Sequence, residues 1–288
     1  MEETTDNAPM LYFGYGSNLD KEDWTKWCED RGKDPSGLKE LGPAWLDEYK
    51  LVFDYYSKSR KCGAANLVRV ASGMAATPGA LFEIDEYTLK LLDRKEGVKI
   101  PGCYQREHIT VFTADGRSHD AVTYIHINDD STHYEPSKHY ESLIRNGLVR
   151  LNLTTVWLDF AIRKEIQPRF DLVFVYGSLM SGKSRQSVME DGCEFVCNGT
   201  TQGNLYDVSD YPGLVHGEGV VHGELYRAVD MFEVIQRLDW IEGAHGENPL
   251  FNRIIRKINT AQGEFWAYSY NYNLDVEESK LIPSGKWN

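Results

Sequence analysis

Two short runs of apolar and aromatic residues in this 288-residue chain end at the same tripeptide, Tyr-Gly-Ser. Residues 11–14 lead into Tyr15-Gly16-Ser17, and residues 172–175 lead into the second copy, at 176–178. Their length and composition predict β-strands. Glycine permits a sharp turn in which backbone N–H groups approach a ligand, and loops at strand ends often carry chemistry. Each Tyr-Gly-Ser loop is therefore a candidate site.

A second motif follows each loop in the same order. Leu-Asp-x-x-Glu-Gly occurs at residues 92–97 and again at 238–243, and the two motifs stand further apart in the first copy. Two separated motifs repeated in order indicate an internal duplication. The chain is long enough for two cores. We expect a disordered tail over residues 1–10, a first domain over 11–167 and a second over 168–288.

Hydrophobic periodicity predicts mostly strands with a few short helices in each half, which favours an α+β fold built on a small sheet. In the first half the expected strands cover residues 45–53, 64–70, 79–84, 104–112 and 121–127, and the helices 20–31, 86–95, 140–146 and 155–166. In the second half the strands cover 172–176, 201–208, 219–229, 253–258 and 265–270, and the helices 187–191 and 231–241.

Composition narrows the class of protein. A net charge of −13 argues against a nucleic-acid or anionic-membrane surface, and no apolar run has the ~20 residues of a membrane span. The five cysteines are odd in number and scattered, which is typical of reduced thiols, and we expect a cytoplasmic protein. The eight histidines form no ligand pair at metal-site spacing, so no metal is expected.

The order of the motifs resembles the gamma-glutamylcyclotransferase family. Over residues 11–166 the likeness rests on residues 11–19, the Leu-Asp-x-x-Glu-Gly frame, Tyr104-x-Arg106 and residues 136–140. The second half resembles the shorter branch of that superfamily, which includes gamma-glutamylamine cyclotransferases, through residues 175–179, 204–207, 211–213 and 223–226. The resemblance implies two compact mixed barrels of a six-stranded type with flanking short helices. It implies no cofactor and no metal.

The resemblance also implies a reaction and its residues. Family members release 5-oxoproline from a small gamma-glutamyl compound, because the substrate's own α-amine attacks its γ-carbonyl. The resemblance assigns proton transfer to Glu96 and Glu242. It assigns substrate contacts to the loops and to one downstream tyrosine, namely Tyr12, Tyr15, Gly16, Ser17, Asn18, Leu19 and Tyr140 in the first copy and Tyr176, Gly177, Ser178 and Leu179 in the second.

The residue types suit this chemistry. One carboxyl group can take a proton from the α-ammonium and give one to the leaving amine if its pKa lies near the working pH. Burial raises the pKa of a glutamate, and so does the negative end of a helix dipole. Glu96 and Glu242 each stand at a predicted helix end before glycine. A glutamate in that position is otherwise a solvated surface residue.

The second copy departs from the pattern in three ways. Leu179 stands where the first copy has Asn18, Phe251 stands where it has Tyr104, and Tyr140 has no counterpart. The second domain is therefore either a second active site or a pocket that only binds. A non-catalytic binding or regulatory module on the same fold is the alternative for the whole chain. The leaving amine and the oligomeric state stay open.

Residues 177–184 also match the phosphate-loop pattern Gly-x4-Gly-Lys-Ser. A phosphate-binding loop requires a substantial helix after it and a parallel βαβ sheet. The predicted helix at 187–191 is short and the remaining strands read as antiparallel, so we do not expect nucleotide hydrolysis. Arg106 and Arg253 read as strand residues with a structural charge partner.

Overall fold

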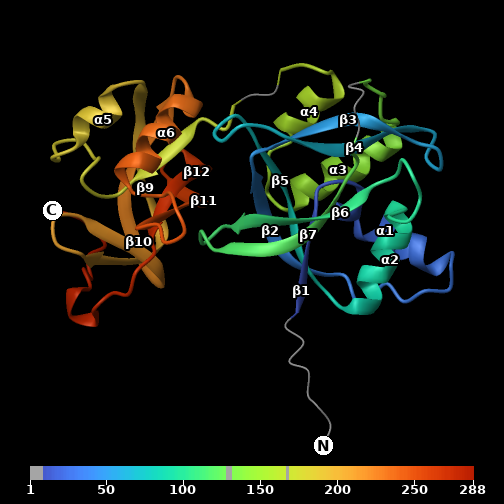
Figure 1. Cartoon of the computed structure of the whole chain (residues 1–288), viewed down its shortest axis with the longest axis horizontal. Helices are drawn as coiled ribbons and strands as arrows, with labels where there is room; N and C mark the ends of the chain where they lie inside the picture. Colours follow the sequence, from blue (N-terminus) through green and yellow to red (C-terminus); the bar gives the residue numbers. More distant parts are fainter. Residues whose placement is uncertain (1–8, 128–131, 167–168) are drawn as a thin grey trace, which may run out of the picture. The chain divides into compact units, whose positions relative to one another are not determined.

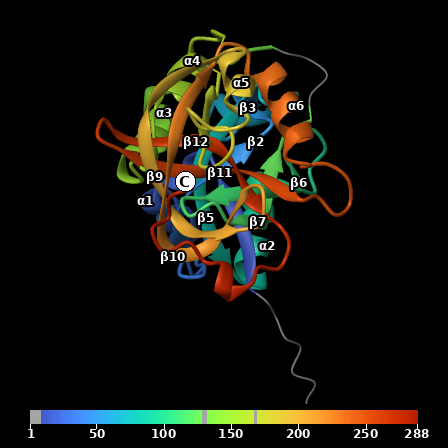
Figure 2. The same cartoon turned by 90° about the vertical axis from the view of Figure 1, so that its left-hand side faces the viewer.

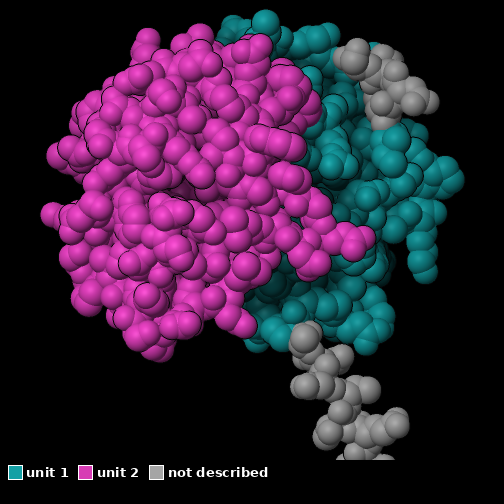
Figure 3. All heavy atoms as spheres, turned by 60° about the vertical axis from the view of Figure 1, so that its left-hand side comes forward, with its two compact units in different colours: residues 1–70, 76–111, 119–168 teal, residues 71–75, 112–118, 169–288 magenta. Residues whose placement is uncertain are grey.

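A computed structural model describes residues 9–127, 132–166 and 169–288 (Figure 1). The chain divides into two compact units (Figure 3), one of residues 1–70, 76–111 and 119–168, the other of 71–75, 112–118 and 169–288. The expected boundary between residues 167 and 168 lies outside the described residues, as does most of the expected tail over 1–10. Those two expectations stay predictions.

The first unit is organised around a closed barrel of five strands in the order β1-β5-β2-β6-β7. These strands are β1 (Met10–Gly14), β2 (Lys39–Asp47), β5 (Ala76–Ile84), β6 (Gln105–Thr113) and β7 (Ser118–Ile125). Antiparallel pairs join β1 to β5 and β5 to β2, whereas β1 meets β7 in parallel, with Tyr12 opposite Val122. That parallel seam closes the sheet on itself.

The second unit contains a barrel of the same connectivity, part of which Figure 2 shows in the strands β9 to β12. Its strands are β8 (Leu172–Val175), β9 (Cys193–Asp207), β10 (Pro212–Ala228), β11 (Phe251–Thr260) and β12 (Gly263–Tyr272). Around the closed ring the strands follow the order β8-β10-β9-β11-β12. This is the order of the first barrel, with β8 to β12 in place of β1, β2, β5, β6 and β7. The α+β fold class and the duplication are confirmed, but the expected six-stranded barrel is wrong, because each described ring closes with five.

Short helices flank both barrels. The first unit has η1 (Ser17–Leu19), α1 (Lys21–Glu29), α2 (Glu86–Glu96), α3 (Lys138–Arg150) and α4 (Val156–Ile162); the second has α5 (Gln186–Glu190), α6 (Met231–Ile241) and η2 (Glu278–Lys280). The Asp85 and Asp230 side chains accept hydrogen bonds from the backbone N–H groups of Thr88 and Phe232. Such caps satisfy N–H groups that lack a partner within the helix, and they fix where α2 and α6 begin.

An additional two-stranded sheet separates β2 from β5 in the first unit. It consists of β3 (Tyr49–Ser57) and β4 (Cys62–Arg69), whereas β9 continues directly into a hairpin with β10 in the second. This insertion accounts for much of the greater motif spacing in the first copy. The single strand expected over residues 45–53 is wrong, because Glu48 has φ of 64° and breaks the run between β2 and β3.

The first strand of each barrel is closely contacted along both of its edges. Thr123 Oγ1 donates to the Phe13 carbonyl at 2.9 Å, and Ser269 Oγ donates to the Phe174 carbonyl at 3.1 Å. On the other edge of β1, where β5 pairs with it, a Cβ atom on Gly79 would lie 2.4 Å from the Gly14 oxygen. Only a residue without a side chain fits there, which explains the glycine in both copies.

We predict that Gly79→Ala and Gly223→Ala each destabilise their own barrel by about 1 to 3 kcal/mol, the usual cost of overpacking. At Gly223 the added Cβ would lie 2.2 Å from the Val175 oxygen. Urea unfolding followed by circular dichroism measures the effect. The control His108→Ala changes an exposed residue of β6 and is expected to stay within about 0.5 kcal/mol of wild type. An alanine variant as stable as that control would refute the close approach.

Candidate active site

The first candidate site lies where α2 ends against the Tyr-Gly-Ser loop. Helix α2 ends at Glu96 because Gly97 adopts the left-handed conformation, with φ of 74° and ψ of 32°. This is the usual way in which glycine terminates a helix. The Glu96 Oε1 atom accepts a hydrogen bond from Asn18 Nδ2 at 3.2 Å. The two sequence motifs are therefore in direct contact in the folded chain.

Asn18 is the centre of a polar cluster. Its Nδ2 atom also donates to the Tyr12 hydroxyl at 2.8 Å, and its Oδ1 atom accepts from Lys95 Nζ. The Lys95 side chain is only 6% exposed and forms an ion pair with Asp23 at 3.4 Å. Burial raises the pKa of Glu96 above its ordinary value, while the Lys95 charge and the Asn18 hydrogen bond oppose that rise.

Arg60 and Tyr140 approach the same loop from other elements. The Arg60 guanidinium donates to Ser17 Oγ at 3.0 Å and pairs with Asp23 at 2.8 Å. It also lies 4.9 Å from the centre of the Tyr140 ring. The Tyr140 hydroxyl accepts from the Ala65 N–H at 3.2 Å. Tyr140 is therefore held beside the loop, and its predicted substrate contact stays a prediction.

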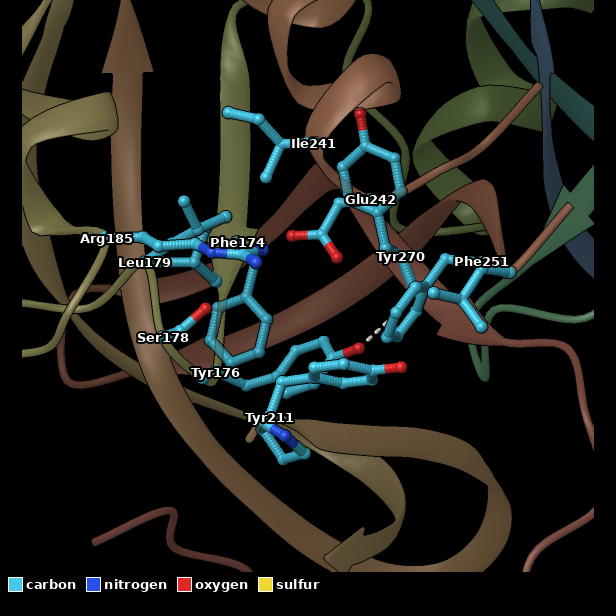
Figure 4. Close-up of a pocket in the computed structure, with 14 residues that line it drawn as sticks. Phe174, Tyr176, Ser178, Leu179, Arg185, Tyr211, Ile241, Glu242, Phe251 and Tyr270 are labelled. Atoms are coloured by element: carbon cyan, nitrogen blue, oxygen red, sulfur yellow. Dashed lines mark hydrogen bonds between the residues drawn. The ribbon is translucent and has the colours of Figure 1, made fainter. Parts of the chain in front are cut away.

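The second candidate site is a cavity of about 90 Å³ in the second unit (Figure 4). Its lining comes from the loop after β8, the β9–β10 turn, the end of α6 and β11–β12, namely Phe174, Val175, Tyr176, Gly177, Ser178, Leu179, Arg185, Tyr211, Pro212, Ile241, Glu242, Leu250, Phe251 and Tyr270. All four predicted loop residues of the second copy line this cavity together with Glu242. Figure 4 shows the Glu242 carboxyl group pointing from α6 into the space beside Arg185 and Tyr176.

The electrostatics of Glu242 differ from those of Glu96. Burial raises the pKa of Glu242 from 4.5 to about 7, and the positive charge of Arg185 opposes the rise. Leu179 and Ile241 occupy the sequence positions that Asn18 and Lys95 occupy in the first copy. Apolar neighbours solvate a carboxylate poorly, so the protonated form is favoured. Near neutral pH this carboxyl group can both take up and release a proton.

The same side-chain frame supports both glutamates. In the first barrel the Asp93 carboxylate binds Arg106 of β6 and accepts from the Tyr124 hydroxyl of β7 at 2.8 Å. The Tyr15 hydroxyl, at the loop, donates to the Tyr124 carbonyl. Asp93 lies three residues before Glu96, so this network ties the last turn of α2 to the barrel.

The second barrel repeats each contact of that frame. Asp239 pairs with Arg253 of β11 and accepts from the Tyr270 hydroxyl of β12 at 2.7 Å, and the Tyr176 hydroxyl donates to the Tyr270 carbonyl at 2.7 Å. The prediction that both strand arginines have a structural charge partner is confirmed. Sequence reasoning did not identify Tyr124 and Tyr270. The one available signal was the aspartate that both copies share.

Three further predictions concern Leu19, the phosphate-loop pattern and metal binding. Leu19 is buried, and a Cβ on Gly147 of α3 would lie 2.4 Å from the Leu19 Cβ. Leu19 therefore packs η1 against α3, and its predicted substrate contact stays a prediction. The helix after the phosphate-loop pattern, α5, has five residues and follows a barrel strand, as expected. Among the residues that the structure describes, no group of His, Cys, Asp and Glu side chains is arranged to hold a metal ion.

Within residues 9–127, 132–166 and 169–288, no helix is both long and apolar enough to cross a bilayer.

Comparison with known proteins gives a consistent set of matches. The family model for "Gamma-glutamyl cyclotransferase, AIG2-like" matches residues 12–142 and 173–288, and so covers both barrels. The Gamma-glutamylcyclotransferase family protein YtfP of Escherichia coli strain K12 is 34% identical over 115 residues, which are 40% of this chain and 94% of that protein. Gamma-L-glutamyl-butirosin B gamma-glutamyl cyclotransferase of Niallia circulans is 31% identical over 107 residues, or 36% of this chain and 67% of that protein. A solved structure named Gamma-glutamyl cyclotransferase is similar with a TM-score of 0.45 and 26% identity, over 56% of this chain and 89% of that one.

We predict that Glu242→Gln stabilises the protein at pH 8 but much less at pH 4.5. The folded carboxyl group holds its proton up to about pH 7, whereas in the unfolded chain it ionises near 4.5. As the pH rises between these values, the wild type therefore loses stability that the glutamine variant keeps, by about 1 to 3 kcal/mol at pH 8. Urea unfolding across this pH range measures the difference.

The control Glu233→Gln changes an exposed glutamate on the same helix, α6, and is expected to show no such pH dependence. A Glu242→Gln effect that is the same at every pH would mean that the Glu242 carboxyl group is well solvated.

Proposed function

The chain belongs to the gamma-glutamyl cyclotransferase family, and from this premise we propose that both barrels release 5-oxoproline from gamma-glutamyl amines or peptides. In this reaction the substrate's α-amine nitrogen bonds to its own γ-carbonyl carbon and closes a five-membered lactam. The bond from that carbon to the leaving amine breaks. The α-ammonium nitrogen loses two protons in becoming the lactam N–H, while the leaving nitrogen gains one to depart as an amine and a second to become an ammonium group. The reaction therefore needs no oxidant and no second substrate.

Glu242 is the proton carrier in the second barrel. In its ionised form the carboxylate takes one of these protons from the α-ammonium group, and in its protonated form it delivers a proton to the departing amine. A pKa of about 7 suits both steps, because neither form is rare near neutral pH. The Asp239–Arg253–Tyr270 network keeps the end of α6 in place while the charge on the carboxyl group changes.

The loop after β8 binds the substrate's oxygen atoms. Gly177 and Ser178 line the cavity, and their backbone N–H groups are suited to hold the γ-carbonyl oxygen, on which negative charge develops during attack. Arg185 on the same cavity wall supplies a positive charge for the α-carboxylate. Held at both ends, the glutamyl group is bent toward the geometry in which its amine meets its own carbonyl.

Glu96 has the same role in the first barrel, with a more polar surrounding. Asn18 orients its carboxylate, and Arg60, which touches Ser17 and Tyr140, supplies the positive charge beside the loop. The observation that carries the proposal is common to both copies. A partly buried glutamate at the end of a helix faces a Tyr-Gly-Ser loop, and one Asp–Arg–Tyr network fixes that helix end in each barrel.

We expect the wild-type chain to release 5-oxoproline from a panel of gamma-glutamyl amines and dipeptides, with the free amine appearing in equal amount. Glu96→Gln and Glu242→Gln each remove the activity of one barrel. The double variant is expected to lose activity by about 100-fold or more, because general acid–base catalysis contributes 10²- to 10⁴-fold. Quantification of 5-oxoproline by liquid chromatography and mass spectrometry measures the loss.

Matched controls are Glu86→Gln and Glu233→Gln, which change exposed glutamates at the starts of the same two helices. They should retain wild-type activity. Full activity of the double variant would show that the glutamates do not carry the proton. A wild type that releases no 5-oxoproline yet binds it would favour the non-catalytic binding module.

A further inference from the structure

Lys95 is a buried cation that the proposed reaction does not use directly. Its Nζ atom donates to Asn18 Oδ1, pairs with Asp23 at 3.4 Å and lies 5.6 Å from the centre of the Trp24 ring. Burial lowers the pKa of this lysine, and the neighbouring carboxylates of Glu96 and Asp23 oppose that change. Keeping a charge in such a place is costly, so its contacts require an explanation.

The chemistry of the Asn18 amide supplies that explanation. An ammonium group only donates hydrogen bonds, so the Asn18 oxygen must face Lys95. The amide nitrogen then faces the other way, and it donates to Glu96 Oε1 and to the Tyr12 hydroxyl. A donated hydrogen bond favours the ionised carboxylate. If the amide rotated by half a turn, its oxygen would face Glu96 and favour the protonated acid.

Other charged and titratable groups also act on Glu96. From neighbouring elements these are Arg60 and Asp23, which have opposite signs and pair with each other at 2.8 Å. Five tyrosine hydroxyls also interact with Glu96, namely those of Tyr12, Tyr15, Tyr55, Tyr104 and Tyr140. Among the charged groups that act on Glu96, Lys95 has the largest effect.

The second barrel is a natural comparison. Leu179 and Ile241 replace Asn18 and Lys95 as a pair, so the amide and the cation that directs it are both missing from these positions. Glu242 keeps the same helix end and the same Asp–Arg–Tyr network, and its principal charged neighbour is Arg185. The exchange of both residues therefore alters the surroundings of the carboxyl group, while the Asp–Arg–Tyr network that holds the helix end stays the same.

We propose that Lys95 is a positioning residue that acts through Asn18 to hold Glu96 in its ionised form, so that the first barrel works at lower pH than the second. This inference rests on the proposed function for its consequence in catalysis. The orientation of the amide and the protonation of Glu96 do not depend on turnover. The two parts can therefore be tested separately.

The protonation of Glu96 can be measured directly by carbon NMR of the full chain labelled with ¹³C at the glutamate carboxyl carbons. The Glu96 signal is identified as the one that Glu96→Gln removes. In Lys95→Met the midpoint of the Glu96 titration is expected to rise by about one pH unit, because the nearby positive charge is lost and nothing then holds the Asn18 nitrogen toward the carboxylate. Lys95→Gln, neutral but polar, is a second variant in case the methionine variant does not fold.

The route through Asn18 is tested in the same spectra. In the Asn18→Leu background, which copies the second barrel, the further change Lys95→Met should shift the midpoint by clearly less than it does with Asn18 present. An unchanged midpoint in Lys95→Met or Lys95→Gln would overturn the proposal. An equal shift in both backgrounds would overturn the role of the amide.

Activity then tests the consequence for catalysis. With Glu242→Gln, only the first barrel can turn over, and with Glu96→Gln only the second. We expect kcat/KM of the second barrel to fall below about pH 7 and that of the first to persist to lower pH. In Lys95→Met, kcat/KM of the first barrel should begin to fall at a higher pH than in the chain that keeps Lys95. If the NMR shift appears but no variant, wild type included, releases 5-oxoproline, the proposed function fails and the role of Lys95 stands. If both barrels are active and their kcat/KM values fall at the same pH, the proposed difference in working pH is wrong.

Discussion

The ion pair between an aspartate near the end of a helix and an arginine on a barrel strand holds both candidate sites in place. Asp93 binds Arg106 and the Tyr124 hydroxyl, and Asp239 binds Arg253 and the Tyr270 hydroxyl. The aspartate lies three residues before the glutamate, about one helical turn, so fixing one side chain fixes the other. In each barrel a second tyrosine, at the Tyr-Gly-Ser loop, donates to the backbone carbonyl of Tyr124 or Tyr270. The end of the helix that carries the glutamate and the loop are therefore both anchored to one strand, β7 or β12.

Duplication has preserved this support while the immediate surroundings of the glutamates diverged. One carboxyl group contacts an amide that a buried lysine orients, and the other lines a cavity with leucine, isoleucine and an arginine. Such a difference alters the free energy of the ionised form without moving the backbone. A tandem chain can in this way keep one reaction and extend the conditions under which it proceeds.

The sequence predicted those parts of the structure that depend on local patterns. The helix over Met231–Ile241 and the helix end at Glu96 before Gly97 both follow from side chains within one or two turns. The repeated motifs predicted the contact between α2 and the loop only through the resemblance to a family. The strand break at Glu48 was missed because a left-handed non-glycine residue leaves no pattern.

Residues from distant segments were the hardest to predict. Arg60 reaches Ser17 from the turn between β3 and β4, and Arg185 reaches the second cavity from a loop that resembled a phosphate-binding pattern. Lys95 occupies a variable position of its motif, and nothing in the sequence marks it as buried. The number of strands also depends on ring closure, which is a property of the whole sheet. Long-range packing decides each of these features, and hydrophobic periodicity does not record it.

A crystal structure of the full chain with bound 5-oxoproline would test the account most directly. We expect the lactam ring in the cavity of the second barrel, with its carbonyl oxygen on the backbone N–H groups of Gly177 and Ser178, its nitrogen beside Glu242 and its carboxylate toward Arg185. Product bound elsewhere, with the Glu242 carboxyl group turned away from that cavity, would contradict the central claim.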